Sequence, residues 1–312
     1  MTSRPADGPL DCHPADAAER EAAFGNVHEV WGGGLPIEEY LAWRLNSATH
    51  ARACWYVGCR EGRVVTSLGA YPIAVQANGA RLEGFSIGAV HTVPDSRRRG
   101  YAAELMAWVE QHQVRQGAEV GLLYSDIEPS YYARMGYRLC ESYEGWITPE
   151  VTVSSGDGPL LRFSANEQLE QVADLYRRGQ AQRRIWIDRD PAYWEWICRR
   201  YPEHEWYWWM KDGQAGGYVQ VAASDPEIRL VDWGLESDTD EAAFWDSIIN
   251  WAARRGVARV GGWLSQTEVT QARFEIQPRI RELTMIKPLV DENFWDEEFV
   301  GDAAWFLECD HV

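Results

Sequence analysis

The stretch Val93–Met106, VPDSRRRGYAAELM, places three consecutive arginines and a glycine directly before a segment with helical spacing of apolar residues. It follows an apolar, β-prone run over residues 82–93, LEGFSIGAVHTV. Helix N-termini present unpaired N–H groups and the positive end of the helix dipole, and glycine lets an anion approach the backbone closely. The order of strand, arginine–glycine loop and helix therefore predicts a phosphate cradle at the start of the helix.

The composition of the whole chain limits what this basic cluster can serve. The 312 residues carry a formal net charge of -18 and are 46% hydrophobic, which is an ordinary globular composition. A nucleic-acid partner is disfavoured because phosphate-backbone binding needs a broad basic surface. The acidic balance favours a cationic substrate such as an amine, although the acids can equally serve solubility. The cluster matches neither a Walker A loop nor a GxGxxG dinucleotide fingerprint.

The remaining composition bears on compartment and metals. The first residues are polar and lack the apolar segment of a signal peptide, and no apolar run is long enough to predict a membrane span. The six cysteines show no CxxC pair and no zinc-ligand spacing. We therefore expect reduced thiols, no metal centre and a cytoplasmic location. The oligomeric state is left open, a homo-oligomer included.

The first half of the sequence predicts a helix–helix–strand–strand–strand–helix–strand–short helix–strand order, which is a mixed sheet flanked by helices. The expected helices cover 16–30, 35–45 and 100–116, and the expected strands cover 53–60, 64–75, 82–93 and 117–126, with a helical turn and a last strand within 128–140. Glu61-Gly62 marks a hairpin turn between the first two strands.

The second half repeats this layout in pattern rather than in identity. Asp212-Gly213 replaces Glu61-Gly62 in the hairpin, and a linker-like SSGDGP occupies residues 154–159. We therefore expect two domains, residues 1–153 and 160–312, although two unrelated α/β domains would also fit the pattern. Where a second phosphate cradle would lie, the chain has the acidic run ESDTDE over residues 236–241, which would repel a phosphate.

Two motifs of the first half resemble those of the GNAT superfamily of N-acetyltransferases. Arg97, Gly100 and Ala102 match the family's acetyl-CoA motif Arg/Gln-x-x-Gly-x-Gly/Ala, and Pro94 stands where the family places its proline. The segment Tyr131–Tyr137 matches the aromatic-Tyr-x-x-x-Gly-aromatic signature, one helix and one strand further along. The resemblance implies an α/β (α+β) fold of two tandem GNAT-like domains, each a mixed, mostly antiparallel sheet flanked by helices.

The resemblance also implies direct transfer of an acetyl group from acetyl-CoA to a primary amine of a small, cationic acceptor. Tyr132 falls on the family's general acid, which protonates the departing thiolate; packing or thiol binding is the alternative role. The pantetheine arm is expected on the end of the strand and the pyrophosphate on the loop that follows. The co-substrate-binding residues so implied are Val90, His91, Thr92, Arg97, Arg98, Arg99, Gly100, Tyr101, Ala102 and Ala103.

An attacking amine has to lose a proton, so a general base is also needed. The candidates on or just beyond the two central strands are Glu83, His91, Asp126 and Glu128, and water is a further one. The residues themselves do not choose among these. Two other functions stay open: a CoA-binding sensor without catalysis, and transfer of a longer acyl group.

The tandem arrangement resembles that of the Eis-type acetyltransferases, with only the first half intact. We expect the second half to bind no CoA and to shape the acceptor pocket. Eis-type proteins carry a third domain and use the terminal carboxylate as base; about 20 residues follow the second half here, and neither feature can be transferred. The chain holds 17 tryptophans, many of them within 185–210, where burial in core and interface is expected before an ammonium cage.

Overall fold

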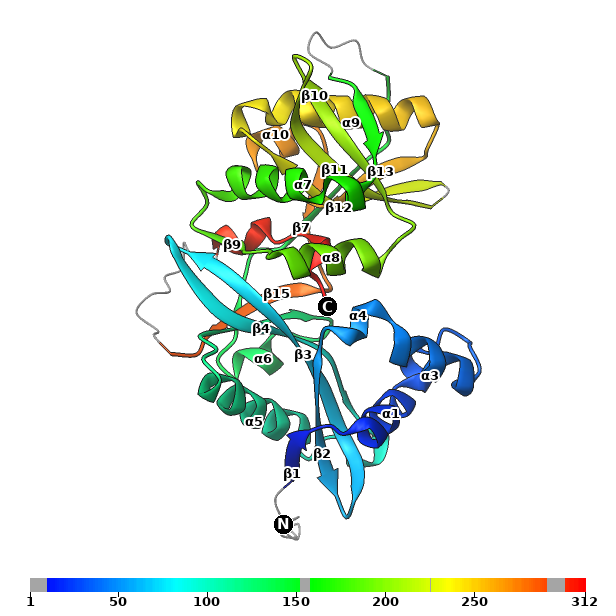
Figure 1. Ribbon diagram of the computed structural model, residues 1–312, viewed down its shortest axis with the longest axis vertical. Helices are drawn as coiled ribbons and strands as arrows, with labels where there is room; N and C mark the ends of the chain where they lie inside the picture. Colours follow the sequence, from blue (N-terminus) through cyan, green and yellow to red (C-terminus); the bar gives the residue numbers. More distant parts are fainter. Residues whose placement is uncertain (1–9, 152–157, 225, 291–300) are drawn as a thin grey trace.

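The computed structural model describes residues 10–151, 158–224, 226–290 and 301–312. Two sheets, of eight and seven strands, are each flanked by helices and lie one above the other along the long axis of the molecule (Figure 1). In the first sheet the order is β1-β2-β3-β4-β5-β15-β6, with β9 paired to β3. In the second sheet the order is β14-β7-β13-β12-β11-β10-β8.

The first half of the chain forms the elements that the sequence predicts, with four differences. Residues 11–14, expected only to precede a helix, form a strand, and the helix expected over 16–30 is divided into two at Val27. A short helix over residues 48–51 and a strand over residues 143–147 are further elements that the sequence did not predict. The elements are β1 (Asp11–Pro14), α1 (Ala17–Asn26), α2 (His28–Trp31), α3 (Ile37–Asn46), α4 (Ala48–Ala51), β2 (Cys54–Arg60), β3 (Arg63–Ala77), β4 (Ala80–Thr92), α5 (Tyr101–Arg115), β5 (Val120–Ser125), α6 (Ser130–Ala133), β6 (Arg138–Leu139) and β7 (Tyr143–Ile147).

The second half repeats this order. Strands β10, β11 and β12, helix α9 and strand β13 follow one another as β2, β3, β4, α5 and β5 do, so the predicted internal repeat is confirmed. The elements are β8 (Leu160–Phe163), α7 (Ala165–Gln180), β9 (Ile185–Ile187), α8 (Pro191–Arg200), β10 (Glu205–Lys211), β11 (Gln214–Ser224), β12 (Glu227–Leu235), α9 (Glu241–Arg255), β13 (Arg259–Trp263), α10 (Glu268–Gln271), β14 (Glu275–Pro278) and β15 (Leu283–Pro288).

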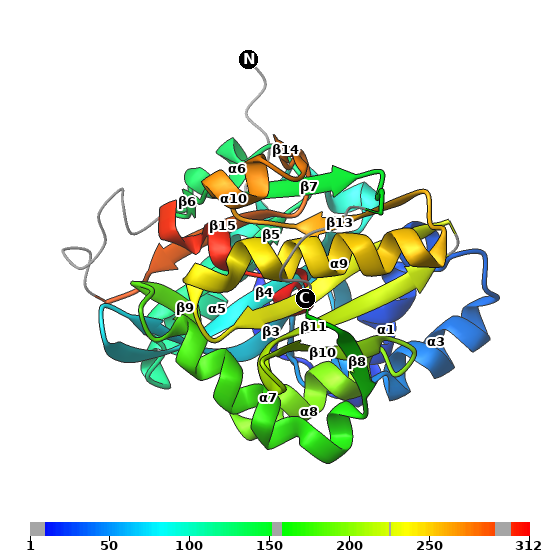
Figure 2. The ribbon, with the colours of Figure 1, turned by 90° about the horizontal axis from the view of Figure 1, so that it is seen from above.

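The two sheets exchange strands. Strand β15 comes after the second domain's core strands, yet it pairs antiparallel with β5, from Leu283 opposite Ser125 to Pro288 opposite Val120. Strand β7 precedes the predicted boundary and lies in the second sheet, between β13 and β14 (Figures 1 and 2). The division at residues 153–160 remains a prediction about domains, but the strand pairing crosses it in both directions.

Helices cover the first sheet on both faces. On one face α5 buries Leu105, Met106 and Val109 against the strands β2, β3 and β4. On the other face α1 lies against β2 and β3, and α3 and α4 extend from it toward the second domain (Figure 1). A capping box fixes the start of α1, because Asp16 accepts from the Glu19 N–H and the Glu19 carboxylate accepts from the Asp16 N–H. The first sheet is therefore packed between α5 on one face and α1 on the other.

A shared apolar core joins the two domains, and tryptophans supply much of it. Trp194 and Trp209 are each 1% exposed, and Trp208 stacks on Phe163 at 4.3 Å between ring centroids. Trp196 donates from Nε1 to the carbonyl oxygen of Ala48 at 3.1 Å, which ties α8 to the first domain. These rings pack in core and interface, as the sequence led us to expect.

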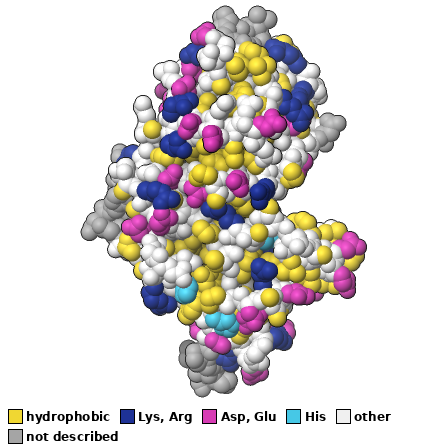
Figure 3. All heavy atoms as spheres, in the orientation of Figure 1, with side chains coloured by type: hydrophobic (Ala, Val, Ile, Leu, Met, Phe, Trp, Pro, Cys, Tyr) yellow, Lys and Arg dark blue, Asp and Glu magenta, His cyan; other side chains and the backbone are white. Residues whose placement is uncertain are grey.

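Three general properties of the chain can be compared with the structure: the distribution of charged side chains, the state of the cysteines and the character of the helices. Acidic and basic side chains are interspersed over the face in Figure 3, whose outline is notched beside the lobe that carries α3. All six cysteines have free thiols, as expected. Within the described residues, no helix has the length and apolar character needed to cross a membrane.

Candidate active site

Strands β4 and β5 form a fork. They pair in parallel from Gly84 opposite Val120 to Ile87 opposite Leu123, after which both strands continue but separate. On its other side β4 slips register against β3, and Ala89 adopts a φ of 53° in the resulting bulge. Beyond Ile87, the edge of β4 that faces β5 has no strand partner in the described chain. This geometry leaves room for an extended ligand arm to pair with β4.

The arginine–glycine loop lies just beyond the fork, at the start of α5. Gly100 is the N-cap, with a φ of 87° that glycine adopts without strain, and no side chain caps the helix. A Cβ placed on Gly100 would meet nothing within 4 Å, so the space beside this residue at the start of α5 is open. Arg97 folds back and donates from Nε to the carbonyl oxygen of Thr92 at 2.9 Å, whereas the Arg98 side chain is exposed.

A pocket of about 330 Å³, here called the fork pocket, opens at the point where β4 and β5 separate. Its walls come from four parts of the chain: the fork itself, the helices α2 to α4, the start of α6, and the last residues of the sequence. The lining residues are Trp31, Arg44, His50, Tyr71, Ile87, Gly88, Ala89, Val90, Leu123, Tyr124, Asp126, Ile127, Tyr132, His311 and Val312.

Tyr132 reaches the fork pocket from α6 and is 8% exposed. Burial, together with the nearby Tyr131 and Asp126, raises its pKa to about 12. The phenol therefore keeps its proton at neutral pH. Its hydroxyl makes no hydrogen bond to another described residue, so it is available to a ligand.

Two histidines of the pocket are held neutral. Burial, and then the charges of Arg44 and Arg200, lower the pKa of His50 to about 3. Burial and three arginines, Arg200 first among them, lower the pKa of His311 to about 3 as well. Nδ1 of His50 lies 3.3 Å from the Tyr71 hydroxyl, while its Nε2 is buried without a partner among the described residues. A neutral Nε2 of this kind can accept a hydrogen bond from a ligand.

Of the four residues predicted as candidate bases, only Asp126 lines the fork pocket. Glu83 lies toward the opposite end of β4, opposite Ala74, and pairs with Arg81. His91 is 8% exposed and packs near the ring of Trp31. Burial and the charge of Arg97 lower the pKa of the His91 imidazole. Glu128 is exposed on the loop before α6.

The predicted co-substrate residues form one continuous track. Val90 lines the fork pocket, and His91 and Thr92 continue β4 toward the loop. The loop residues 97–100 are exposed and lead directly into the first turn of α5 with Tyr101, Ala102 and Ala103. The structure thus brings Tyr132 and Val90 into one pocket and places the arginines at its outer end.

Sequence reasoning missed several pocket residues, because they come from distant segments and carry no local motif. Arg44 stands out only in the structure, where this charged residue of α3 is 4% exposed. His311 and Val312 were assigned to a short trailing segment. That segment reaches the fork pocket of the first domain, and Arg200 of α8, in the second half of the chain, donates to the main-chain oxygens of Cys309 and His311. A Cβ placed on Gly88 would lie 2.9 Å from the main-chain oxygen of Val312, so only glycine allows this close contact.

The second domain has an equivalent fork, in which β12 and β13 pair in parallel from Glu227–Arg259 to Leu230–Gly262. Beyond the paired stretch, β12 carries Asp232, whose side chain is fully buried and paired within the protein. The Arg189 guanidinium, fully buried, bonds to Asp232 and to Asp310 of the trailing segment. The acidic run before α9 is likewise paired within the protein: Glu236 with Arg178, Asp238 with Arg183, and Asp240 with Lys211. That this half binds no CoA stays a prediction.

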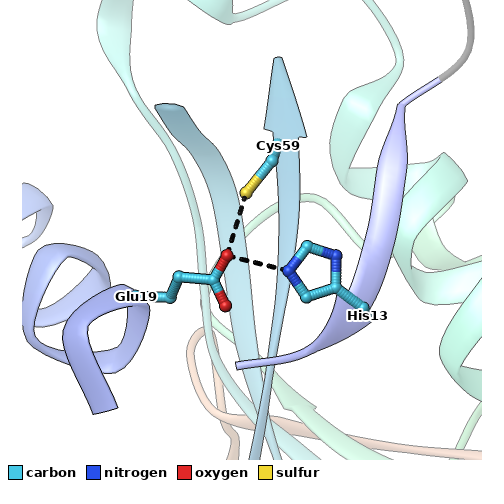
Figure 4. Close-up of side chains that lie close together, drawn as sticks. All are labelled: His13, Glu19 and Cys59. Atoms are coloured by element: carbon cyan, nitrogen blue, oxygen red, sulfur yellow. Dashed lines mark hydrogen bonds and ion pairs between the residues drawn. The ribbon is translucent and has the colours of Figure 1, made fainter. Parts of the chain in front are cut away.

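A second cluster of polar side chains lies away from both forks. His13 of β1, Glu19 of α1 and Cys59 of β2 point toward one another, with one ligand-type atom from each within 4.8 Å of the others (Figure 4). Oε1 of Glu19 lies 2.8 Å from His13 Nε2 and accepts from the Cys59 thiol at 3.7 Å. Burial and the Glu19 carboxylate raise the pKa of Cys59 to about 11. Since these groups satisfy one another and Glu19 also caps α1, the cluster has a structural explanation.

Comparison with known proteins places this geometry in a class. Residues 12–140 match the family model described as an acetyltransferase (GNAT) domain. The first domain is therefore a GNAT acetyltransferase domain, and the proteins of this class are acyl-CoA-dependent N-acyltransferases. No curated protein sequence is similar enough to count as a match.

The likeness of the fold extends over both halves of the chain. A probable N-acyltransferase from Enterococcus faecalis V583 superposes with a TM-score of 0.72 at 16% identity, covering 91% of this chain and 74% of its own. A GCN5-related N-acetyltransferase from Anabaena variabilis gives 0.70 at 19% identity, covering 90% and 73%. Eis1 from Mycobacterium abscessus gives 0.61 at 18% identity, covering 90% and 73%. The predicted tandem GNAT fold, resembling the Eis-type arrangement, is confirmed.

Proposed function

We propose that the protein transfers an acetyl group from acetyl-CoA to the primary amine of a small acceptor. The observation that carries this proposal is the convergence of three features on one pocket. The fork offers an unpaired strand edge, the uncapped start of α5 offers an anion cradle, and Tyr132 offers a protonated hydroxyl between them.

The loop and helix start are suited to hold a pyrophosphate. The space beside Gly100 at the start of α5 is open, and the start of a helix presents main-chain N–H groups that can donate to phosphate oxygens. The exposed Arg98 adds a positive charge at the same place. The free edge of β4 at Ala89 and Val90 can pair with the amides of a pantetheine arm, which directs the thioester into the fork pocket.

Tyr132 is the proposed proton donor to sulfur. In the reaction the amine nitrogen bonds to the thioester carbonyl carbon, the carbon–sulfur bond breaks, and the thiolate takes up the Tyr132 proton. The raised pKa of about 12 guarantees that the proton is present at neutral pH. Because this value exceeds the ordinary thiol pKa of about 8.5, transfer of the proton to sulfur requires that burial in the pocket raise the pKa of the thiol as well. The phenolate then regains a proton from solvent.

The proton lost by the amine requires an acceptor, and Asp126 or a water molecule beside it is the candidate among the predicted bases. Asp126→Asn separates these two sources: kcat should fall if the Asp126 carboxylate accepts the proton, and should stay nearly unchanged if water accepts it.

The second domain is proposed to shape the acceptor side of the pocket. Its contribution is the trailing segment, which is bound by Arg189 and Arg200 and brings His311 and Val312 to the fork. Transfer of an acyl group longer than acetyl would use the same residues. Measuring the rate with acyl-CoA substrates of different chain lengths distinguishes acetyl transfer from transfer of a longer acyl group.

The test is thiol release from acetyl-CoA against a panel of primary amines, with CoA binding measured separately by calorimetry. Acetyl transfer to at least one amine, confirmed by the mass of the product, is the expected result. Tight CoA binding with no turnover on any amine would instead support a sensor. Failure of the folded protein to bind CoA would exclude both.

A further inference from the structure

The fork pocket contains a buried cation without an anion. Arg44, on α3, is 4% exposed and donates from Nη1 to the Tyr40 hydroxyl at 2.8 Å. Its guanidinium carbon lies 4.9 Å from the ring centroid of Phe24 and 5.4 Å from that of Trp31. Within the part of the chain that the structure describes, no carboxylate pairs with it. Aromatic faces attract a cation but do not neutralise its charge.

Buried charges in proteins are normally paired, and this protein follows the rule elsewhere. Arg189 is as deeply buried as Arg44 and has two carboxylates, Asp232 and Asp310, at 2.9 and 2.8 Å. Arg189 also lines a pocket, beside α7 and α8, but it already has its anions. Arg44 lines the fork pocket, and its Nε is buried without a partner among the described residues. The missing anion is therefore one that a ligand can supply.

Two further buried polar atoms of the same pocket lack partners. They are Nε2 of His50 and the hydroxyl of Tyr124, both without a hydrogen bond to any described residue. Native structures leave few buried polar groups unsatisfied, so three in one pocket indicate a polar ligand that completes them. Asp126 is the one carboxylate side chain among the described lining residues; it is exposed and accepts from the Glu282 N–H at 3.3 Å.

We propose that the acceptor is an amino-acid-like zwitterion whose carboxylate binds Arg44 in the fork pocket, an inference that rests on the proposed acetyl transfer. A guanidinium presents parallel donors that match a carboxylate in two hydrogen bonds, and the bond to Tyr40 and the aromatic rings hold it in place. The neutral His50 Nε2 can accept from the acceptor amine. A pocket of about 330 Å³ restricts the acceptor to a small molecule.

This acceptor differs from the cationic one that the net charge predicts. The charge of -18 belongs to the whole chain, whose acids are dispersed over the surface (Figure 3). The pocket itself carries a buried arginine and two histidines that are neutral at pH 7. Local charge, rather than net charge, decides which ligand is stabilised there.

The test compares each amino acid with its own carboxamide, since the pair differs in the negative charge and little in shape. For the wild-type protein we expect kcat/KM to be at least about tenfold higher for the acid than for the amide, the range of one charge-assisted hydrogen bond. Arg44→Met should abolish that preference by lowering kcat/KM for the acid alone, and Arg44→Lys should keep part of it. Arg52→Met is the matched control, because Arg52 stacks on Tyr193 and Trp196 and does not line the pocket.

Equal use of acids and amides by the wild-type protein would overturn the proposal, and so would an equal loss for both in Arg44→Met. The ratio is internal to each variant, so partial unfolding does not imitate it, and the wild-type ratio stands even where Arg44→Met does not fold. If no amine is acetylated, the proposed function fails separately. The carboxylate site is then tested by the melting temperature of the CoA-bound protein in the presence of amino acids. A rise in melting temperature that is smaller with the amides and in Arg44→Lys supports the carboxylate site. No rise with amino acids contradicts it.

Discussion

The two forks of this molecule have the same backbone plan and opposite contents. Between β4 and β5 the pocket is open and lined by polar atoms that lack partners, and the loop before α5 is basic. In the second domain, Asp232 lies on β12 beyond its pairing with β13 and is paired with the buried Arg189, which also bonds to Asp310, and the run before α9 is acidic and paired. The two halves share a backbone plan but differ in whether their buried charges are paired within the protein. Where the charges are paired, as in the second half, the unit serves as structure; where they are not, as in the first half, a ligand can bind.

The largest effect is expected when the buried cation of the second domain, Arg189, is removed. Arg189→Met leaves Asp232 and Asp310 buried without a counter-charge, so the free energy of unfolding should fall by about 3–5 kcal/mol. Denaturant titration measures this. Arg178→Met, which breaks an exposed pair with Glu236, is the control and should cost about 0–1 kcal/mol. Similar losses in both variants would mean that the buried network is not what holds the second domain.

The next largest effect is expected in the open fork. Tyr132→Phe removes the hydroxyl and retains the ring, so kcat should fall about 100-fold or more while the Kd for CoA stays nearly unchanged. Steady-state kinetics and calorimetry provide the two readings. The neighbouring Tyr131→Phe should leave both unchanged. A collapse of CoA binding in Tyr132→Phe would show that the residue binds the thiol rather than protonating it.

The charge contrast between the two loops gives a smaller effect. Arg98→Glu makes the first loop resemble the second, and the Kd for CoA should rise about tenfold or more, with a weaker dependence on salt. Arg115→Glu, at the other end of α5, makes the same change in net charge and should have little effect. Equal effects of the two substitutions would indicate general electrostatics instead of a phosphate cradle.

The smallest effect concerns the neutral histidines of the open fork. The pKa of His50 is about 3 in the folded protein and about 6.5 in an unfolded chain, so the unfolded state binds the proton more readily below pH 6.5. The stability that the neutral His50 contributes is therefore present above pH 6.5 and is lost as the pH drops toward 3, by about 1 kcal/mol between pH 7 and 5.5. His311, whose pKa is lowered in the same way, contributes a similar loss. His50→Gln should therefore reduce the slope of the stability–pH curve without removing it, whereas His112→Gln, on α5, should leave the slope as in the wild type.

Much of this architecture can be predicted from the sequence, because element types follow from local patterns. The run from Val93 to Met106 predicts the loop and helix start, and the signature around Tyr132 places that side chain near the fork. Which strand pairs with a given strand edge cannot be predicted in the same way. Nothing in the sequence of residues 283–288 specifies pairing with β5, some 160 residues earlier, because either face of such a run fits several edges.

The pocket residues were missed for a similar reason. Arg44, His50 and His311 come from segments that the tertiary fold brings together, and none belongs to a motif. Arg44 and His50 are recognised as site residues because their buried nitrogen atoms lack hydrogen-bond partners among the described residues, and this can be seen only in the folded structure. The same holds for the His13–Glu19–Cys59 cluster, whose three residues lie on separate elements.

The exchange of β7 and β15 has a consequence for how the protein is made. Translation delivers β1 to β6 first, but β15 has to be inserted between β5 and β6 before the first sheet is complete. A nascent chain of 150 residues therefore exposes the free edge of β5, which invites aggregation or chaperone binding. A chain that lacks residues 301–312 should also lack the wall of the fork pocket that His311 and Val312 form.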